Sequence, residues 1–78
     1  MTCRHEVLEC AREIVDESGV NEFTPKEIVS RMKSKGTAFK ESTIRTHVVS
    51  RMCANAPQHH AVKYEDFERI GHGVYKML

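Results

Sequence analysis

The sequence predicts an α+β domain in which three helices precede a C-terminal β-hairpin. In three separate segments before residue 55, apolar residues recur at the spacing that one face of a helix requires. After residue 66, two short segments rich in aromatic and aliphatic residues flank Gly71-His72-Gly73, a pattern typical of a hairpin. The length of 78 residues predicts one domain, residues 1–78, and the content of 40% hydrophobic and 29% charged residues excludes disordered and collagen-like classes.

The first helix is predicted between Thr2 and Gly19. Thr2 can cap the first turn through its hydroxyl, and Gly19 can adopt the left-handed conformation that commonly ends a helix. Glutamates occupy one side of this segment. The other side is apolar and consists of Val7, Leu8, Ala11, Ile14 and Val15.

The second helix begins with a clear signature. Thr24-Pro25-Lys26-Glu27 combines an N-cap threonine, a proline at the first helical position and a glutamate at N3, which together make a capping box. The preceding residues 21–24 are too few for a helix and are expected to be extended. The helix is predicted to end at Gly36 and to bury Ile28, Val29 and Met32.

A third helix is predicted from about residue 41 to residue 54, after a connection whose Phe39 is expected to fill the core. Asn55-Ala56-Pro57 is expected to stop this helix, and its apolar stripe is Ile44, Val48 and Met52. Serine and threonine form helices less well than glutamate or lysine, so a helix face made of them favours a binding role. That face carries Ser42, Thr43, Thr46 and Ser50, flanked by Arg45 and His47.

The last third of the chain changes character. Residues 57–60 are predicted to form a loop, residues 61–64 are ambiguous, and residues 67–70 and 74–78 are predicted strands. Two helices joined by a tight glycine-containing turn form a candidate helix-turn-helix, and a C-terminal hairpin would make it a winged helix. The extended segment at Phe23 is placed to join the hairpin as a third strand.

Three segments carry a resemblance that covers nearly all of the chain: residues 23–28 (FTPKEI), 42–48 (STIRTHV) and 67–75 (FERIGHGVY). The chain resembles small prokaryotic winged helix-turn-helix domains, which occur alone or attached to nuclease and modification-system domains. The resemblance implies binding of double-stranded DNA, by a transcription regulator or by the DNA-reading part of a restriction–modification or defence system. It implies that the third helix, with Ser42, Thr43, Arg45, Thr46 and His47, faces the major groove. It implies that the wing, residues 67–78, brings Arg69 and His72 to a backbone or minor groove.

The charge distribution agrees with such a role. The net charge is +1, but residues 1–22 carry two basic and six acidic residues, whereas residues 23–51 carry seven basic and two acidic ones. A basic middle segment is a hint of nucleic-acid contact. Lys33, Lys35 and Lys40 are candidates for phosphate contacts, with ordinary surface lysines that give solubility as an equally weighted alternative. Arg51 lies near the Ile44 stripe, and its alternative role is to pair with the acidic first helix. That helix is also the expected contact surface for a second copy or a fused partner.

A protein-interaction module is the alternative function, and the near-neutral net charge favours it. Recognition of modified bases is a third possibility that the resemblance suggests. We expect no enzyme activity, since no phosphate-binding loop is present and Cys53 lies near a helix C-terminus. We expect no metal and no cofactor, because neither Cys3-x-His5 nor His59-His60 has ligand spacing.

The chain is expected to be cytoplasmic, and associated with the nucleoid if it binds DNA. Its first residues become acidic where a signal peptide would become apolar, and no apolar run is long enough to span a membrane. Three cysteines without a disulfide framework are expected to be free thiols in a reducing compartment.

Overall fold

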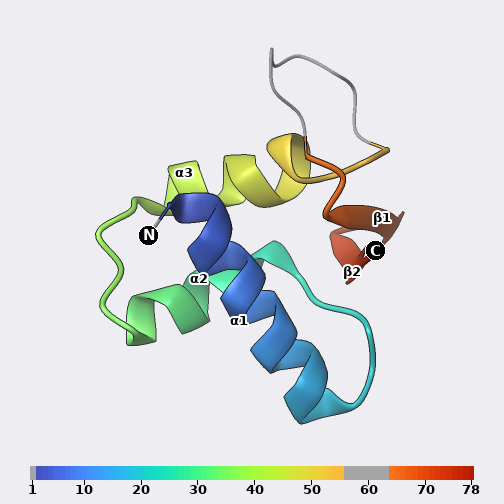
Figure 1. Ribbon diagram of the computed structural model, residues 1–78, viewed down its shortest axis with the longest axis horizontal. Coiled ribbons are helices and arrows are strands. Elements are labelled where there is room, and N and C mark those ends of the chain that lie inside the picture. Colours follow the sequence, from blue (N-terminus) through green and yellow to red (C-terminus); the bar gives the residue numbers. More distant parts are fainter. Residues whose placement is uncertain (1, 56–63) are drawn as a thin grey trace.

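The structure is a computed structural model that describes residues 2–55 and 64–78 (Figure 1). Those residues form an α+β arrangement with a two-stranded antiparallel hairpin at the C-terminus. The loop predicted at residues 57–60, the ambiguous residues 61–63 and the Ala56-Pro57 helix stop lie outside the described residues. The elements in chain order are α1 (Cys3–Ser18), α2 (Pro25–Ser34), α3 (Glu41–Thr46), the π-helical segment η1 (His47–Arg51), β1 (Phe67–Gly71) and β2 (Val74–Met77).

The predicted ends of α1 are confirmed. The Thr2 hydroxyl accepts a hydrogen bond from the His5 N–H at 3.2 Å, which satisfies one of the free N–H groups of the first turn. Gly19 follows the helix with a left-handed φ of 74°, and its N–H donates to the Val15 carbonyl at 2.9 Å. Both ends are therefore determined by local hydrogen bonds that the sequence alone specifies.

The capping box of α2 is also present. The Glu27 N–H donates to the Thr24 hydroxyl at 3.2 Å, and the Thr24 N–H donates to the Glu27 carboxylate at 2.9 Å. Such a cap stabilises a helix by about 1 kcal/mol. The helix ends at Ser34, and Gly36, with a left-handed φ of 77°, turns the chain toward α3.

The third helix differs from its prediction. It begins at Glu41 as expected, but after Thr46 it continues as η1, in which the Met52 N–H donates to the His47 carbonyl at 2.8 Å. Side chains four residues apart drift forward around an α-helix of 3.6 residues per turn. The wider turn of a π-helix rotates the later side chain back toward the earlier one. Val48 and Met52, four residues apart, are both fully buried, and we attribute η1 to the need to direct both side chains into the core.

The hairpin pairs Phe67 with Met77 and Arg69 with Tyr75, and its register shifts between Arg69 and Gly71. Gly71 therefore belongs to β1, while His72 and Gly73 form the turn. The third strand predicted at Phe23 is a single antiparallel bridge to Tyr75, with two backbone hydrogen bonds of 2.9 Å each.

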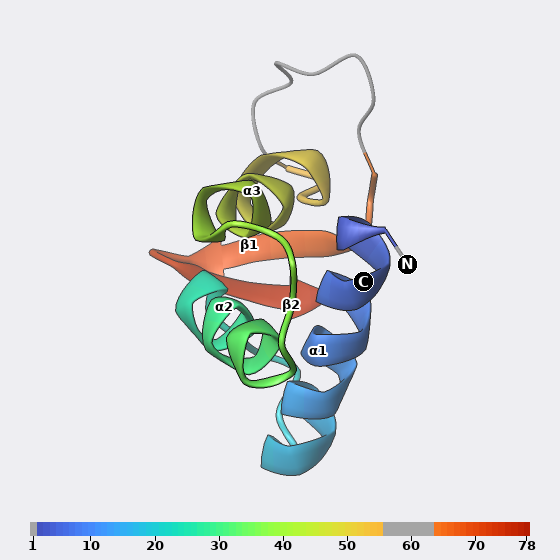
Figure 2. The ribbon, with the colours of Figure 1, turned by 90° about the vertical axis from the view of Figure 1, so that its left-hand side faces the viewer.

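One core lies between the helices and the hairpin. The Phe23 and Phe67 rings meet edge to face at a centroid distance of 4.7 Å, and Phe39 packs against the core while half-buried. In Figure 2 the hairpin passes between α3 above and α2 below, its turn projects to the left, and α1 lies at the right. The hairpin turn and α1 thus lie on opposite sides of the molecule.

The N-terminus is tied to the start of the hairpin by Arg4. Its guanidinium donates two hydrogen bonds to the Asp66 carboxylate, at 2.8 and 2.9 Å, and lies 4.1 Å from the centre of the Tyr64 ring. The Asp66 side chain is only 14% exposed. Asp66 is therefore a largely buried carboxylate with a structural partner.

Two further sequence expectations concern thiols and membranes. Cys3, Cys10 and Cys53 are buried free thiols, and burial raises the pKa of Cys3 and Cys10. In the described part of the chain, no helix has the length and apolar character needed to cross a bilayer.

Candidate nucleic-acid interface

The outer surface of α3 and η1 is a stripe of small and charged side chains. Ile44 and Val48 point into the core and are fully buried. The exposed stripe on the other side is Glu41, Ser42, Arg45, Thr46 and Val49. Of the polar face predicted from the sequence, Ser42 and Thr46 belong to this stripe, whereas Thr43 and Ser50 are half-buried. Val49, a residue not predicted there, is the apolar member of the stripe.

One flank of the stripe adjoins a shallow depression of about 390 Å³ between α2 and α3. Its lining holds three cations and one carboxylate: Lys26, Lys33, Arg45 and Glu41. Lys33 and Arg45 both donate to the Glu41 carboxylate, each at 3.2 Å. The hydrogen bond from Lys33, followed by that from Arg45, lowers the pKa of Glu41, which keeps the carboxylate ionised.

The other flank adjoins a depression of about 340 Å³ lined by Ser42, Thr43, Thr46, His47 and Arg51. The Thr46 hydroxyl donates to the Ser42 carbonyl at 2.9 Å, and His47 Nδ1 lies 2.9 Å from the Thr43 carbonyl. A carbonyl oxygen only accepts, so this contact requires a proton on His47 Nδ1 and leaves Nε2 out of it. Arg51 supplies the positive charge on this flank.

The predicted site residues are all at least partly accessible. Ser42, Thr43, Thr46 and His47 come together in the second depression, and Arg45 lies in the first. Thr43, His47 and Ser50 are half-buried. The exposed ones are Lys40, Ser42, Arg45, Thr46, Arg69 and His72.

The two wing residues lie apart from these depressions, on the hairpin. Arg69 Nε donates to the Gly71 carbonyl at 3.1 Å, which folds the side chain back along its own strand. His72 lies in the turn, which projects on the side away from α1 (Figure 2).

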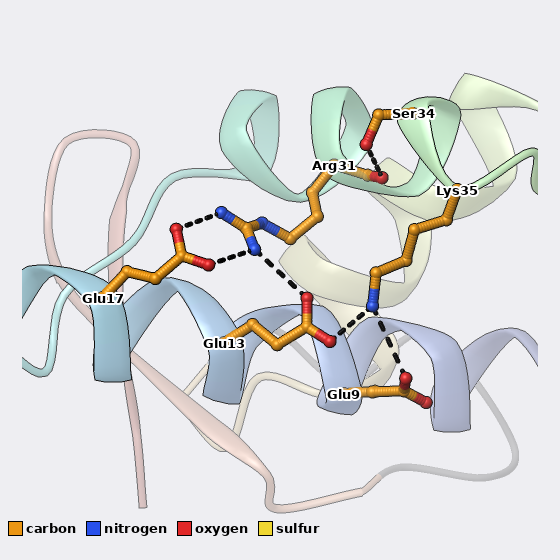
Figure 3. A network of polar contacts seen from close by, with 6 residues as sticks. All are labelled: Glu9, Glu13, Glu17, Arg31, Ser34 and Lys35. Atoms are coloured by element: carbon orange, nitrogen blue, oxygen red, sulfur yellow. Dashed lines mark hydrogen bonds and ion pairs between the residues drawn. The ribbon is translucent and has the colours of Figure 1, made fainter.

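Arg31 and Lys35 of the basic segment extend toward the acidic side chains of α1 (Figure 3). Arg31 donates to both oxygens of Glu17, each at 2.5 Å, and to Glu13 at 3.1 Å. Lys35 donates to Glu13 at 2.5 Å and to Glu9 at 3.5 Å. These hydrogen bonds lower the pKa of Glu13 and Glu17 and raise that of Lys35.

This network revises three sequence expectations. Lys35, a predicted phosphate ligand, is held by two carboxylates of α1. Arg51 was an alternative partner for α1, but within the described chain Arg31 and Lys35 make those pairs and Arg51 lines the second depression. The acidic side of α1 that was expected to meet a partner is in large part turned toward α2.

Two site residues were not predicted. Lys26 was seen only as part of the capping box, although its exposed position in the first turn of α2 places it beside α3. Arg51 was predicted to pair with the first helix, because its position was judged from a regular α-helix. The π-helical segment η1 gives the last turn a different rotation, and Arg51 lines the second depression. In residues 2–55 and 64–78, no three His, Cys, Asp or Glu side chains gather as metal ligands, and His59 and His60 lie outside these ranges.

A comparison with protein families matches residues 3–77 to a domain of unknown function (DUF7669). The chain belongs to the DUF7669 family. Searches of curated proteins and of solved structures found no match. The DUF7669 match runs from α1 to β2 and therefore covers all the helices and strands of the described residues.

Proposed function

We propose that the chain is a DNA-binding winged helix. In this proposal α3 and η1 enter the major groove and the hairpin, residues 67–78, is the wing. One observation carries it: an exposed stripe of small polar side chains and Arg45 runs along a helix between two cation-lined depressions. The biological setting would be a transcription regulator or the DNA-reading part of a restriction–modification or defence system.

The dimensions and chemistry of B-DNA fit this arrangement. The major groove is about 12 Å wide and admits one helix, whose outer side chains meet base edges. Ser42, Arg45 and Thr46 have the short or planar donors and acceptors that base edges pair with. The exposed methyl groups of Val49 suit the methyl group of a thymine.

The cations of the two flanks would then meet phosphates on the two sides of the groove. Lys26 and Lys33 line one flank, and Arg51 lines the other. Phosphate contacts fix the register of a protein on the duplex but carry no sequence information. Lys40, which precedes α3 and is exposed, is a further phosphate ligand in this proposal.

A single copy is expected to bind weakly. One such module buries only about 600–1,000 Å² on DNA, and here Arg31 and Lys35 are committed to α1. A second copy or a fused partner would supply the remaining affinity. Because α1 lies on the side opposite the hairpin turn, a partner bound to α1 would lie away from the wing (Figure 2).

A protein-interaction module remains the second candidate. Two exposed apolar side chains favour it: Val49 of η1 is 36% exposed and Ile70 of β1 is 43% exposed. In that case the same helix and hairpin would contact an apolar protein surface, and the interaction would respond little to salt.

The test is a two-dimensional NMR titration of the labelled chain with a random-sequence duplex at about 50 and then about 200 mM salt. Shifts at residues 40–51 and 69–72 and at Lys26, which fade at the higher salt, support DNA binding. Absence of shifts at low salt overturns it and places the protein-interaction function first.

A further inference from the structure

Glu41, the first residue of α3, accepts hydrogen bonds from two basic side chains. Its two carboxylate oxygens hold different cations: Oε1 accepts from Lys33 Nζ, and Oε2 accepts from Arg45 Nε, each at 3.2 Å. All three side chains are accessible to solvent. One acidic residue thus links the end of α2 to the exposed stripe of α3.

The contact determines which part of the Arg45 side chain is available. Because Nε–H is used by Glu41, the terminal Nη1 and Nη2 groups retain their N–H donors, and among the described residues no other group accepts from them. Two adjacent N–H donors in one plane match the O6 and N7 acceptors of guanine in the major groove. An unanchored arginine would be free to follow the phosphates instead.

The same contact reduces the positive charge offered to phosphates. Lys33 and Arg45 account for two of the three cations in the depression between α2 and α3, and both share the Glu41 charge. Attraction to the DNA backbone is independent of sequence, so this carboxylate weakens binding to every duplex. The Glu41 carboxylate favours a base contact only because its hydrogen bond from Arg45 Nε orients the Arg45 guanidinium.

We propose that Glu41 is a positioning residue that directs Arg45 to a guanine and lowers non-specific affinity. This inference rests on the proposed DNA binding and adds to it the base that is recognised. A purely structural role predicts a different result, since exposed ion pairs contribute little to stability. Loss of Glu41 would then leave the sequence specificity unchanged, whatever its effect on the affinity for all duplexes.

The experiment first selects the preferred duplex of the wild-type chain from a random-sequence library. Dissociation constants for that duplex and for a scrambled one are then measured for the wild type and for Glu41→Gln. Glutamine keeps the size of the side chain but has one acceptor oxygen and no charge, so it cannot hold both Lys33 and Arg45. Asp16→Asn, which makes the same charge change on the exposed side of α1, is the matched control.

In Glu41→Gln, the affinity for the scrambled duplex is expected to rise while the sequence specificity falls. Glu41→Gln should bind the scrambled duplex about two- to threefold more tightly, and the ratio of specific to scrambled affinity should fall about fivefold or more. Asp16→Asn should leave that ratio unchanged. Arg45→Lys, which keeps the charge but lacks the planar pair of donors, should lower the ratio without strengthening the binding of the scrambled duplex.

The outcomes separate this inference from the proposed function. If the ratio for Glu41→Gln equals that of the wild type, or if the wild type selects no guanine, Glu41 does not position Arg45, while DNA binding stands. If the wild type binds no duplex at about 50 mM salt, the proposed function itself falls. Unchanged NMR spectra of the free variants, outside the vicinity of residue 41, will show that the fold is intact.

Discussion

The side-chain amide of Asn55 pairs with the backbone of Arg69 as a neighbouring β-strand would. The Arg69 N–H donates to Asn55 Oδ1 at 3.0 Å, and Asn55 Nδ2 donates to the Arg69 carbonyl at 3.1 Å. Opposite Arg69 in the hairpin, Tyr75 directs its own N–H and carbonyl outward to Phe23. This is the geometry of a non-hydrogen-bonded antiparallel pair, whose backbone groups need partners outside the hairpin.

An asparagine side chain also pairs with the backbone at the other edge of the hairpin. Asn21 donates to the Met77 carbonyl and accepts from the Met77 N–H, both at 2.9 Å. An unpaired strand edge is a template for unwanted pairing with other chains. Two asparagine side chains therefore complete the edges of a hairpin that has only two strands.

Replacement of Asn55 by alanine should loosen the hairpin at Arg69. We expect faster amide hydrogen exchange at Arg69 and a loss of about 1 kcal/mol in the free energy of unfolding. Both hydrogen bonds to the Arg69 backbone are lost, as is the one that the Cys53 thiol donates to Asn55 Oδ1 at 3.1 Å. Asn21→Ala is the matched control and should accelerate exchange at Met77 but not at Arg69. Unchanged exchange at Arg69 in Asn55→Ala would show that water or another group protects this amide.

The sequence predicted those parts of the fold that depend on neighbours in the chain. Thr2, Thr24 and Glu27 make their caps with groups three residues away, so residue type and spacing suffice to locate them. The π-helical segment was missed because its cause is the fit of Val48 and Met52 in the core, which no local signal expresses. The hydrogen bonds between Asn55 and Arg69 were not predicted either, because they join residues 14 positions apart that only the folded chain brings together.

The candidate site shows the same division. The exposed stripe of α3 followed from helical periodicity, which identifies the face opposite Ile44 and Val48. Which cations lie beside that stripe depends on how α2 packs, so Lys26 and Arg51 were not predicted. A signal for the α1–α2 network was present: acids at positions 9, 13 and 17 and bases at 31 and 35 each lie four residues apart.

Removal of the Arg4 guanidinium should destabilise the whole domain modestly. We expect Arg4→Gln to lower the free energy of unfolding by about 1 kcal/mol, since Asp66, at 14% exposure, loses its charged partner. Urea unfolding measures the change, and Arg12→Gln, on the exposed side of α1, serves as the control. In a chain that already carries Asp66→Asn, Arg4→Gln should lower the free energy of unfolding by a smaller amount. Equal costs in both backgrounds would show that the two side chains do not interact.

The α1–α2 network predicts a loss of stability in acid. The pKa values of Glu13 and Glu17 are held below the ordinary value of 4.5 by hydrogen bonds, chiefly from Lys35 to Glu13 and from Arg31 to Glu17. A lowered pKa in the folded state stabilises the protein above the unfolded-state pKa, and that contribution is lost as the pH falls through the folded-state value. Stability should therefore decline below pH 4.5.

Urea unfolding between pH 7 and pH 3 tests this expectation. The double variant Glu13→Gln, Glu17→Gln should have a flatter dependence of stability on pH than the wild type. Glu22→Gln, at an exposed position after α1, should follow the wild type. Since the network is largely accessible to solvent, the difference should shrink at high salt. An acid limb that is equally steep in the double variant would assign the loss to other carboxylates.

Lys26 and Arg51 provide the test of the two-flank geometry itself. If each contacts one phosphate, Lys26→Gln and Arg51→Gln should each reduce the slope of log affinity against log salt by about 1. Each should weaken binding to all duplexes uniformly, because phosphate contacts carry no sequence information. Arg12→Gln removes the same charge from α1, on the side away from the hairpin turn, and should leave the slope unchanged (Figure 2). Equal changes in all three variants would mean that net charge alone attracts DNA, and the two depressions beside α3 would lose their assignment as phosphate sites.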